Sequence, residues 1–216
     1  MTKVAVYTGE GSDASVVIAL MKAWSFSVDE VDKPDLVNLS NESIDVLYLP
    51  PGYYIFEEAT NTAISEFTRR GGGVVGSCCG AWNIACSIGL IPSSHNQILM
   101  EGRVSLRPKK GNHPILSNHV KRKNCESISR DRLPMTHING ALFMPADRET
   151  ILATFDEQDQ FAAILAAEVG KGRAVAFSSH AEIPVKVEGK EIDNSPLLKD
   201  AILWAARSAI TVNNGD

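Results

Sequence analysis

The sequence predicts an α/β fold in which a mainly parallel sheet is covered by helices on both faces. Short apolar runs alternate along the chain with segments whose apolar residues recur at helical spacing. The strand-like runs are continuously apolar, as in buried parallel strands, and turn-forming residues separate them from the helices. With 216 residues, of which 44% are hydrophobic and 22% charged, the chain is long enough for one domain over residues 1–216.

The alternation of strands and helices begins at the first residues. Residues 3–7, KVAVY, predict a strand, and the following TGEGSD supplies turn and cap residues. A helix is expected over 14–24, with Asp13 as its N-cap. The helix expected over 56–70 carries acidic residues in its first turn and arginines in its last, and Gly71 stands at its C-cap position. Further strands are expected at 44–49 and 72–77, and a further helix at 78–90.

The pattern changes between about residues 95 and 169. Strand-like runs there are separated by turn and charged residues, so we expect antiparallel strands that extend or flank the sheet. A buried strand then returns at 172–180, and a closing helix follows over 195–210, with Ser195 as its cap and Pro196 at its first position. The added strands are expected at 97–106, 140–145, 150–155 and 161–169.

Composition and charge argue against several classes of protein. The net charge of −5 speaks against a nucleic-acid partner, and the short basic run at 120–126 is better explained as a solvated loop or edge. We expect no signal peptide and no membrane partner, because no run of about 18 apolar residues is present. The cysteines have neither zinc-ligand spacing nor the density of a disulfide framework. We therefore expect no metal, no cofactor and a reducing, cytoplasmic location. The four cysteines of the chain are Cys78, Cys79, Cys86 and Cys125.

Residues 76–82, GSCCGAW, place two cysteines between glycines where a strand passes into a helix. A nucleophile on an α/β sheet is often held on such a sharp turn, whose crowding requires small residues two positions before and after it. Cys78 has Gly76 and Gly80 at those positions, whereas Cys79 would have serine and alanine. The spacing favours Cys78 as the nucleophile, and the positive helix end would stabilise its thiolate. The alternative is two small buried residues at the start of a core helix.

An oxyanion on a carbonyl attacked by Cys78 would need hydrogen-bond donors. In this register the backbone N–H of Cys79 is one donor. The second is expected from another loop at the strand ends. Gly52, in LPPGYY after the strand at 44–49, would allow the close backbone approach that this role requires.

His180 is the histidine best placed to activate a cysteine. It follows RAVAFSS and should emerge at the carboxyl end of a buried strand, the edge where open α/β sheets place their sites. Glu182, two residues further on, can accept a hydrogen bond from the imidazole and complete a Cys-His-Glu arrangement. The other four histidines lie in turn-rich or mixed segments, and we expect them to be loop or structural residues. They are His95, His113, His119 and His137.

These segments resemble the class I glutamine amidotransferase-like superfamily, and within it most closely the domain at the N-terminus of some biotin-protein ligases. GGGVVGSCCGAW and FSSHAE carry much of the similarity. In that domain the elbow reads Gly-x-Cys-Ala-Gly-Ala-aromatic, which is matched here by Gly76, Cys78, Gly80, Ala81 and Trp82. The similarity extends over most of the chain through NHPIL at 112–116, HINGALF at 137–143 and the closing SPLLKDAILWAA.

The resemblance implies a flavodoxin-like three-layer sandwich with a cysteine nucleophile elbow. It also implies a role for each candidate residue of the site. Cys78 would be the nucleophile, His180 the base and Glu182 the group that orients the base, with oxyanion donors from Gly52 and Cys79.

Two differences from that superfamily speak against glutamine as the substrate. Trp82 stands where glutamine amidotransferases commonly carry a glutamine. Tyr53 and Tyr54 follow Gly52, in a loop where paired glycines are usual. Because 216 residues hold no synthetase or ligase domain, an ammonia acceptor would have to belong to a separate partner enzyme.

Three functions remain open on the sequence. The first is an amidotransferase-like or amide-hydrolysing enzyme that forms a thioester on Cys78 with a small-molecule substrate. The second is a non-catalytic module that binds a small ligand in a pocket lined by Tyr53, Tyr54 and Trp82, for which packing roles are equally open. The third is a redox or chaperone-like relative in which Glu10 shares a proton with Cys78, although a solvated turn is the preferred interpretation of Glu10.

Overall fold

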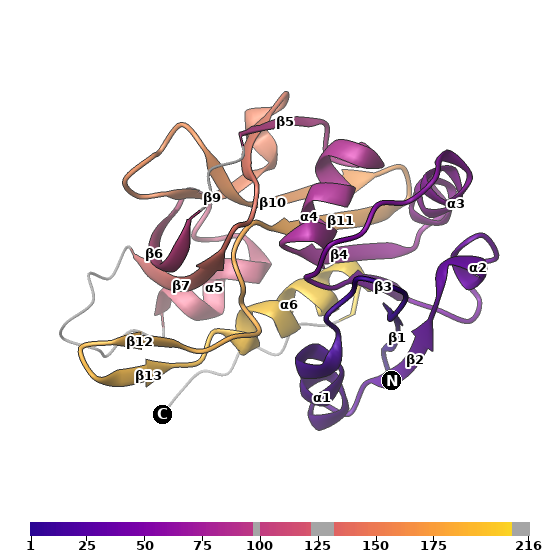
Figure 1. Ribbon diagram of the computed structural model, residues 1–216, viewed down its shortest axis with the longest axis horizontal. Helices are drawn as coiled ribbons and strands as arrows, with labels where there is room; N and C mark the ends of the chain where they lie inside the picture. The colour runs from indigo at the N-terminus through magenta and orange to yellow at the C-terminus, as the bar shows by residue number, and fades with distance from the viewer. Residues whose placement is uncertain (97–99, 122–131, 209–216) are drawn as a thin grey trace.

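A mixed sheet runs through the molecule (Figure 1). The structure, a computed structural model, describes residues 1–96, 100–121 and 132–208, and within them eleven strands join one sheet with a parallel and an antiparallel half. In spatial order, the parallel half contains β2 (Ser27–Val31), β1 (Lys3–Tyr7), β3 (Val46–Leu49), β4 (Gly73–Ser77) and β11 (Gly172–Phe177).

The parallel half contains the four buried strands that the sequence predicted, and one more. In β1, β3, β4 and β11 nearly every residue is buried, which matches their continuously apolar sequences. The strand β2 was not predicted, because SVDEV at the edge of the sheet is mostly polar and only partly buried.

The antiparallel half continues the sheet from β11 and confirms the predicted antiparallel extension. Two of its strands, β5 and β7, were not predicted, because SSHN is polar and LPMTHI contains a proline. In spatial order this half contains β10 (Ala162–Val169), β9 (Ile151–Phe155), β6 (Glu101–Pro108) and β7 (Leu133–Ile138), with β8 (Leu142–Pro145) beside β10 and β5 (Ser93–Asn96) beside β8.

Helices cover both faces of the parallel half. On one face lie α1 (Ser15–Ala23) and α6 (Ser195–Ala205), and on the other α3 (Glu58–Arg69) and α4 (Cys79–Trp82). Strand residues alternate between the two layers: Tyr48 packs in the core under α1 and α6, and its neighbour Leu49 in the core under α3 and α4. The predicted flavodoxin-like three-layer sandwich is confirmed.

Shorter elements complete the chain. A π-helical turn at Asn83–Ser87 continues α4, and a two-stranded hairpin precedes α6. The remaining elements are α2 (Lys33–Leu36), α5 (Pro114–Lys121), a 3₁₀ turn at Arg148–Thr150, β12 (Val185–Val187) and β13 (Lys190–Ile192).

Three of the predicted helix caps are off by one residue. The N-cap of α1 is Ala14, and the Asp13 carboxylate accepts from the hydroxyl of Ser15, at 3.4 Å, instead of from a backbone N–H of the helix. Ser195 is the first residue of α6 and follows the N-cap Asn194. Gly71 follows the C-cap of α3 with a φ of 127°, a conformation that favours glycine.

Three expectations fall wholly or partly outside the described residues. They concern Cys125 with most of the basic run at 120–126, the start of the strand expected at 97–106, and the end of the helix expected at 195–210. Among the helices that are described, none has both the length and the apolar character needed to cross a membrane.

Candidate active site

Cys78 occupies a strained turn between β4 and α4. Its φ of 53° and ψ of −111° lie in a region that residues with a side chain rarely adopt. The turn is held from both sides, because the N–H of Cys78 donates to Phe177 O at the end of β11, at 2.9 Å, and the N–H of Trp82 donates to Cys78 O, at 3.0 Å. This conformation leaves the Cys78 side chain half-buried at the carboxyl ends of β4 and β11.

The two glycines that flank the elbow are required by close packing. A Cβ atom on Gly76 would lie 2.7 Å from the carbonyl carbon of Gly80, and a Cβ atom on Gly80 would lie 1.9 Å from Leu49 O. Real Cβ atoms essentially never approach other atoms so closely. The glycine spacing in the sequence therefore has a direct physical cause at this turn.

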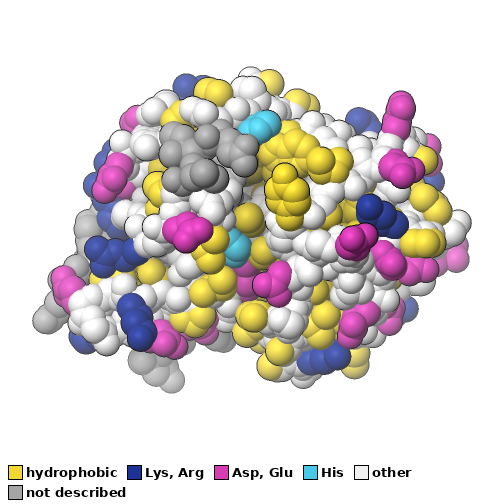
Figure 2. Space-filling model, in the orientation of Figure 1, with side chains coloured by type: hydrophobic (Ala, Val, Ile, Leu, Met, Phe, Trp, Pro, Cys, Tyr) yellow, Lys and Arg dark blue, Asp and Glu magenta, His cyan; other side chains and the backbone are white. Residues whose placement is uncertain are grey.

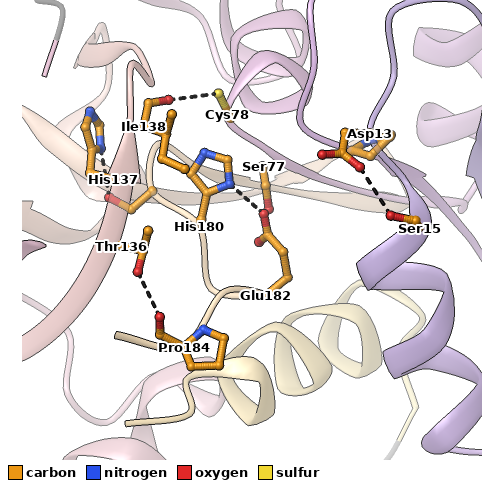
Figure 3. A network of polar contacts seen from close by, with 12 residues as sticks. Asp13, Ser15, Ser77, Cys78, Thr136, His137, Ile138, His180, Glu182 and Pro184 are labelled. Carbon is orange, nitrogen blue, oxygen red and sulfur yellow. Dashed lines mark hydrogen bonds and ion pairs between the residues drawn. The ribbon is translucent and has the colours of Figure 1, made fainter. Parts of the chain in front are cut away.

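His180 and Glu182 lie beside the elbow, just beyond the end of β11. The Nδ1 of His180 and Oε1 of Glu182 are 2.7 Å apart, and both side chains are buried. The backbone N–H of His180 donates to Thr136 O on β7, which fixes this segment against the antiparallel half. Figure 3 shows the imidazole ring between Glu182 and Cys78. The structure therefore brings the three residues of the predicted triad together.

Burial and the two neighbours Cys78 and Glu182 together set the ionisation of His180. Burial lowers the pKa of His180, but hydrogen bonding and charge interactions with Cys78 and Glu182 more than offset this, and together raise the pKa from 6.5 to about 10. By hydrogen-bond geometry, the Sγ of Cys78 donates to Ile138 O at 3.5 Å, and Nε2 of His180 has no partner among the described residues. Cys78 thus affects the pKa of His180 although no hydrogen bond of good geometry joins the two side chains.

Two backbone amides beside Cys78 are available to a ligand. Within the described part of the chain, the N–H groups of Gly52 and Cys79 donate to no other protein group, whereas the N–H of Tyr53 donates to Gly11 O at 2.7 Å. Both Gly52 and Cys79 border the same pocket as Cys78. They are the two residues that the sequence suggested as oxyanion donors.

The side chain of Cys79 points inward and differs from Cys78 in its surroundings. Its Sγ donates to Tyr54 O at 3.2 Å and lies 3.5 Å from the N–H of Tyr54. Burial raises the pKa of the Cys79 thiol, which favours the unreactive protonated form. Of Cys79, only the backbone N–H is placed to bind a ligand in the site.

A pocket of about 230 Å³ opens over Cys78. Figure 2 shows a cluster of hydrophobic side chains with histidines beside it on the visible face of the molecule. The described residues that line the pocket are Gly52, Tyr53, Tyr54, Ile55, Cys78, Cys79, Trp82, His95, Asn139, Gly140 and Ala141.

The three predicted pocket aromatics occupy different positions. Tyr53 is 91% exposed at the rim, whereas the ring of Tyr54 is buried and its hydroxyl donates to Pro50 O. Trp82 is half-buried, and its indole N–H donates to Nε2 of His95 at 3.3 Å. Tyr54 is therefore a packing residue in its side chain, and Trp82 and Tyr53 offer their rings to the pocket.

The wall opposite the elbow was not predicted from the sequence. This wall consists of His95 on β5 and the turn at 139–141 between β7 and β8. The antiparallel pairing of β5 with β8 brings these two parts of the chain together. The HINGALF segment was noted at 137–143, but only for its resemblance to a family. A positive φ of 52° at Asn139 marks the tight turn, and asparagine before glycine was the available signal.

The other histidines and Glu10 do not line the pocket. His119 pairs with Asp200 at 3.0 Å, His113 packs against the ring of Trp204, and His137 is fully buried with its Nδ1 3.2 Å from Ser179 Oγ. Glu10 is exposed and does not line the pocket. Nowhere in the described residues do three or more histidines, cysteines or acidic residues gather as metal ligands would.

Comparison with known proteins gives information on the fold. No family model and no curated protein matches the sequence. Among solved structures, PurLQS from Thermotoga maritima matches with 15% identity and a TM-score of 0.68, over 94% of this chain and 98% of that one. A glutamine amidotransferase from the same organism matches with 19% identity and a TM-score of 0.58, over 84% and 76% of the two chains. The chain has a class I glutamine amidotransferase-like fold.

Solved structures that are not named as amidotransferases match this fold as well. A ThuA-like protein from Bacteroides uniformis matches with 11% identity and a TM-score of 0.62, over 94% of this chain and 91% of that one. At these identities the likeness concerns the fold alone, and a fold hosts different activities. The function must be argued from the residues of the site.

Proposed function

We propose that this chain is a cysteine-dependent enzyme that cleaves an amide C–N bond, as a hydrolase or as an amidotransferase. The observation that carries the proposal is the combination at one strand edge of Cys78 on a strained elbow with a buried His180–Glu182 pair beside it. A nucleophile, a base and a group that orients the base are the three parts of such a catalytic unit. The pocket over Cys78 supplies space for a substrate.

In the first half of the reaction, the sulfur of Cys78 attacks the amide carbonyl carbon. The thiol proton passes to Nε2 of His180, and the carbonyl oxygen becomes an oxyanion facing the N–H groups of Gly52 and Cys79. His180 then donates that proton to the amide nitrogen. The C–N bond breaks, ammonia or an amine leaves, and the acyl group remains on Cys78 as a thioester.

In the second half, water attacks the thioester carbonyl. His180 accepts a proton from the water and returns it to the sulfur as the C–S bond breaks, which releases a carboxylic acid and restores Cys78. In an amidotransferase, the ammonia from the first half would pass to an acceptor on a separate partner enzyme. A reducing cytoplasm would keep the Cys78 thiol available for both steps.

The raised pKa of His180 supports this cycle. A pKa of about 10 means that the imidazole binds the proton taken from the Cys78 thiol strongly, so the ring holds that proton until the leaving nitrogen accepts it. Glu182 contributes by accepting from Nδ1, which leaves Nε2 directed at the reacting atoms. The elbow residues Gly76, Cys78, Gly80, Ala81 and Trp82 match the elbow of the domain at the N-terminus of some biotin-protein ligases, and membership of that family is part of the proposal.

A non-catalytic ligand-binding module is the second candidate. The observation that favours it is the hydrogen bond from Cys78 Sγ to Ile138 O, which occupies the thiol proton that His180 would have to accept. In that case the pocket would bind a small molecule without turnover. The two candidates make opposite predictions for the chemistry of Cys78.

Release of ammonia from a panel of primary carboxamides tests the proposed enzyme. We expect at least one amide to be cleaved, and Cys78→Ala to lower kcat/KM by at least about 10³-fold. Cys79→Ala serves as the matched control, since it keeps the backbone N–H and removes only the inward thiol; its turnover should stay within a few-fold of the unchanged protein. Ammonia release that survives Cys78→Ala would contradict the proposal, and saturable amide binding without any turnover would favour the binding module.

A further inference from the structure

In the part of the chain that the structure describes, the walls of the pocket over Cys78 are uncharged. None of the described residues that line it is an aspartate, glutamate, lysine or arginine. The imidazole of His95, which lines the pocket, accepts from the indole N–H of Trp82 through Nε2. Because an indole nitrogen can only donate, this contact requires a deprotonated Nε2 and therefore a neutral ring.

Charged residues lie close by, but none of those that the structure describes lines the pocket. The carboxylate of Glu101 is exposed and accepts from the side chain of Asn139, at 2.8 Å. His180 is buried against Glu182 and does not line the pocket. A zwitterionic amino acid would therefore place its ammonium and carboxylate against walls with no opposite charge, and unpaired charge is costly to take from water.

The rim of the pocket is apolar as well as uncharged. Few large hydrophobic side chains in the described residues are exposed, and three of them surround this site: Tyr53 at 91%, Ile55 at 64% and Ile138 at 39%. Tyr53 and Ile55 line the pocket, and the carbonyl of Ile138 is the acceptor for Cys78 Sγ. Exposed apolar side chains around a functional cleft mark a surface that an apolar ligand can cover.

From these walls and this rim we infer that the pocket selects an amide whose acyl group is uncharged and apolar, and that it discriminates against glutamine. The inference rests on the proposed function for the role of Cys78, and it adds the substrate class. Trp82 and Ile55 are the residues that set this selectivity, by offering apolar surface where a carboxylate or ammonium would need a partner.

Two amides of the same length provide a direct test. In 4-methylpentanamide, two methyl groups replace the ammonium and carboxylate of L-glutamine, and the reacting carboxamide is unchanged. Binding is measured by NMR on the Cys78→Ala protein, with the indole N–H signal of Trp82 as reporter and those of Trp24 and Trp204, outside the pocket lining, as internal references. We expect 4-methylpentanamide to bind with a Kd at least roughly tenfold below that of glutamine. Equal or tighter binding of glutamine overturns the inference, as does the absence of any shift at Trp82 with both amides.

This experiment is separate from the test of catalysis. The Cys78→Ala protein cannot form a thioester, so selective binding to it supports the inference whether or not the unchanged protein cleaves an amide. If the unchanged protein cleaves no amide, only the proposed function is contradicted. If the unchanged protein hydrolyses glutamine with a higher kcat/KM than 4-methylpentanamide, the proposed function stands and the inference fails.

A charge placed on the rim gives a second, independent test. Ile55→Lys introduces a cation at an exposed position where folding should tolerate it, and Val37→Lys is the matched control at a 47% exposed position outside the pocket lining. Ile55→Lys should lower the preference for 4-methylpentanamide over glutamine by about two- to fivefold, the range of an exposed ion pair, and Val37→Lys should leave it unchanged. Equal effects of the two substitutions would contradict a role for the rim in selectivity.

Discussion

The floor and the wall of the pocket differ in origin and in chemistry. The floor, Cys78 with His180 and Glu182 beside it, comes from the ends of β4 and β11 in the parallel half and combines a strained backbone with a buried ion pair. The wall, formed by His95 and the turn at 139–141, comes from the antiparallel half and carries no formal charge. In the proposed function, the parallel half therefore supplies the reacting groups together with the rim residues Trp82 and Ile55, and the antiparallel half closes the pocket with an uncharged wall.

The two regions are nevertheless tied together. A Cβ atom on Gly140 would lie 1.9 Å from Ser178 O, and the hydroxyl of Ser178 donates to Ala141 O. The thiol of Cys78 reaches across to Ile138 O on the same turn. A change in the wall is therefore expected to move the floor only when it disturbs these contacts, whereas a change of the rim side chains should alter selectivity alone.

Removal of the charge from the floor should have the largest effect. Glu182→Gln keeps the shape of the side chain but leaves the imidazolium without its anion, so the pKa of His180 should fall from about 10 toward 6.5. For any amide that the protein cleaves, kcat/KM should drop by about 10²- to 10³-fold. NMR titration of the His180 ring and steady-state kinetics measure the two effects.

The second buried histidine–carboxylate pair provides the control for this substitution. Asp200→Asn removes the anion beside His119, remote from the pocket lining, and should lower stability without lowering kcat/KM. If Asp200→Asn and Glu182→Gln reduce kcat/KM equally, the assignment of Glu182 as the residue that orients His180 for catalysis is wrong.

Crowding at the elbow predicts the next largest effect, on stability. In Gly80→Ala the new Cβ would lie 1.9 Å from Leu49 O, a backbone atom that cannot move aside without shifting β3. The free energy of unfolding should fall by about 3 kcal/mol or more. At Gly89, where φ is 71° but no atom lies within 4 Å of the added Cβ, alanine should cost only about 1 kcal/mol of backbone strain. Urea denaturation compares the two, and similar losses would argue against crowding as the reason for the glycine.

A smaller effect is expected at His137, which lies between floor and wall. Burial, together with the nearby charge of His180, lowers the pKa of His137 to about 4. Because the unfolded chain takes up this proton first, the native state should be fully stabilised above about pH 6.5 and should lose on the order of 2 kcal/mol as the pH falls toward 4. Chemical denaturation at several pH values should show a weaker pH dependence for His137→Gln. An unchanged slope would mean that His137 is not buried in its neutral form.

The sequence predicted the floor far better than the wall, for a physical reason. Glycine spacing around Cys78 and the position of His180 after an apolar run are local signals, because each depends on residues within one strand-turn-helix segment. The wall depends on which antiparallel strands pair. His95 faces Phe143 across β5 and β8, nearly fifty residues apart in the chain, and the polar β5 carries no apolar pattern to reveal it. The inward direction of Tyr54 was likewise not readable from the sequence, since its neighbour Tyr53 has the same side chain and points to solvent.

Acylation of Cys78 is the most direct test of the central claim that the floor is a working nucleophilic site. The protein is mixed with 4-nitrophenyl 4-methylpentanoate, whose acyl group suits the pocket, and is quenched in acid for intact-mass and peptide analysis. We expect one 4-methylpentanoyl group on Cys78, none on Cys79, and acylation slowed by at least about 10²-fold in His180→Gln. An acyl group on another residue, or an equal rate in His180→Gln, would contradict the account.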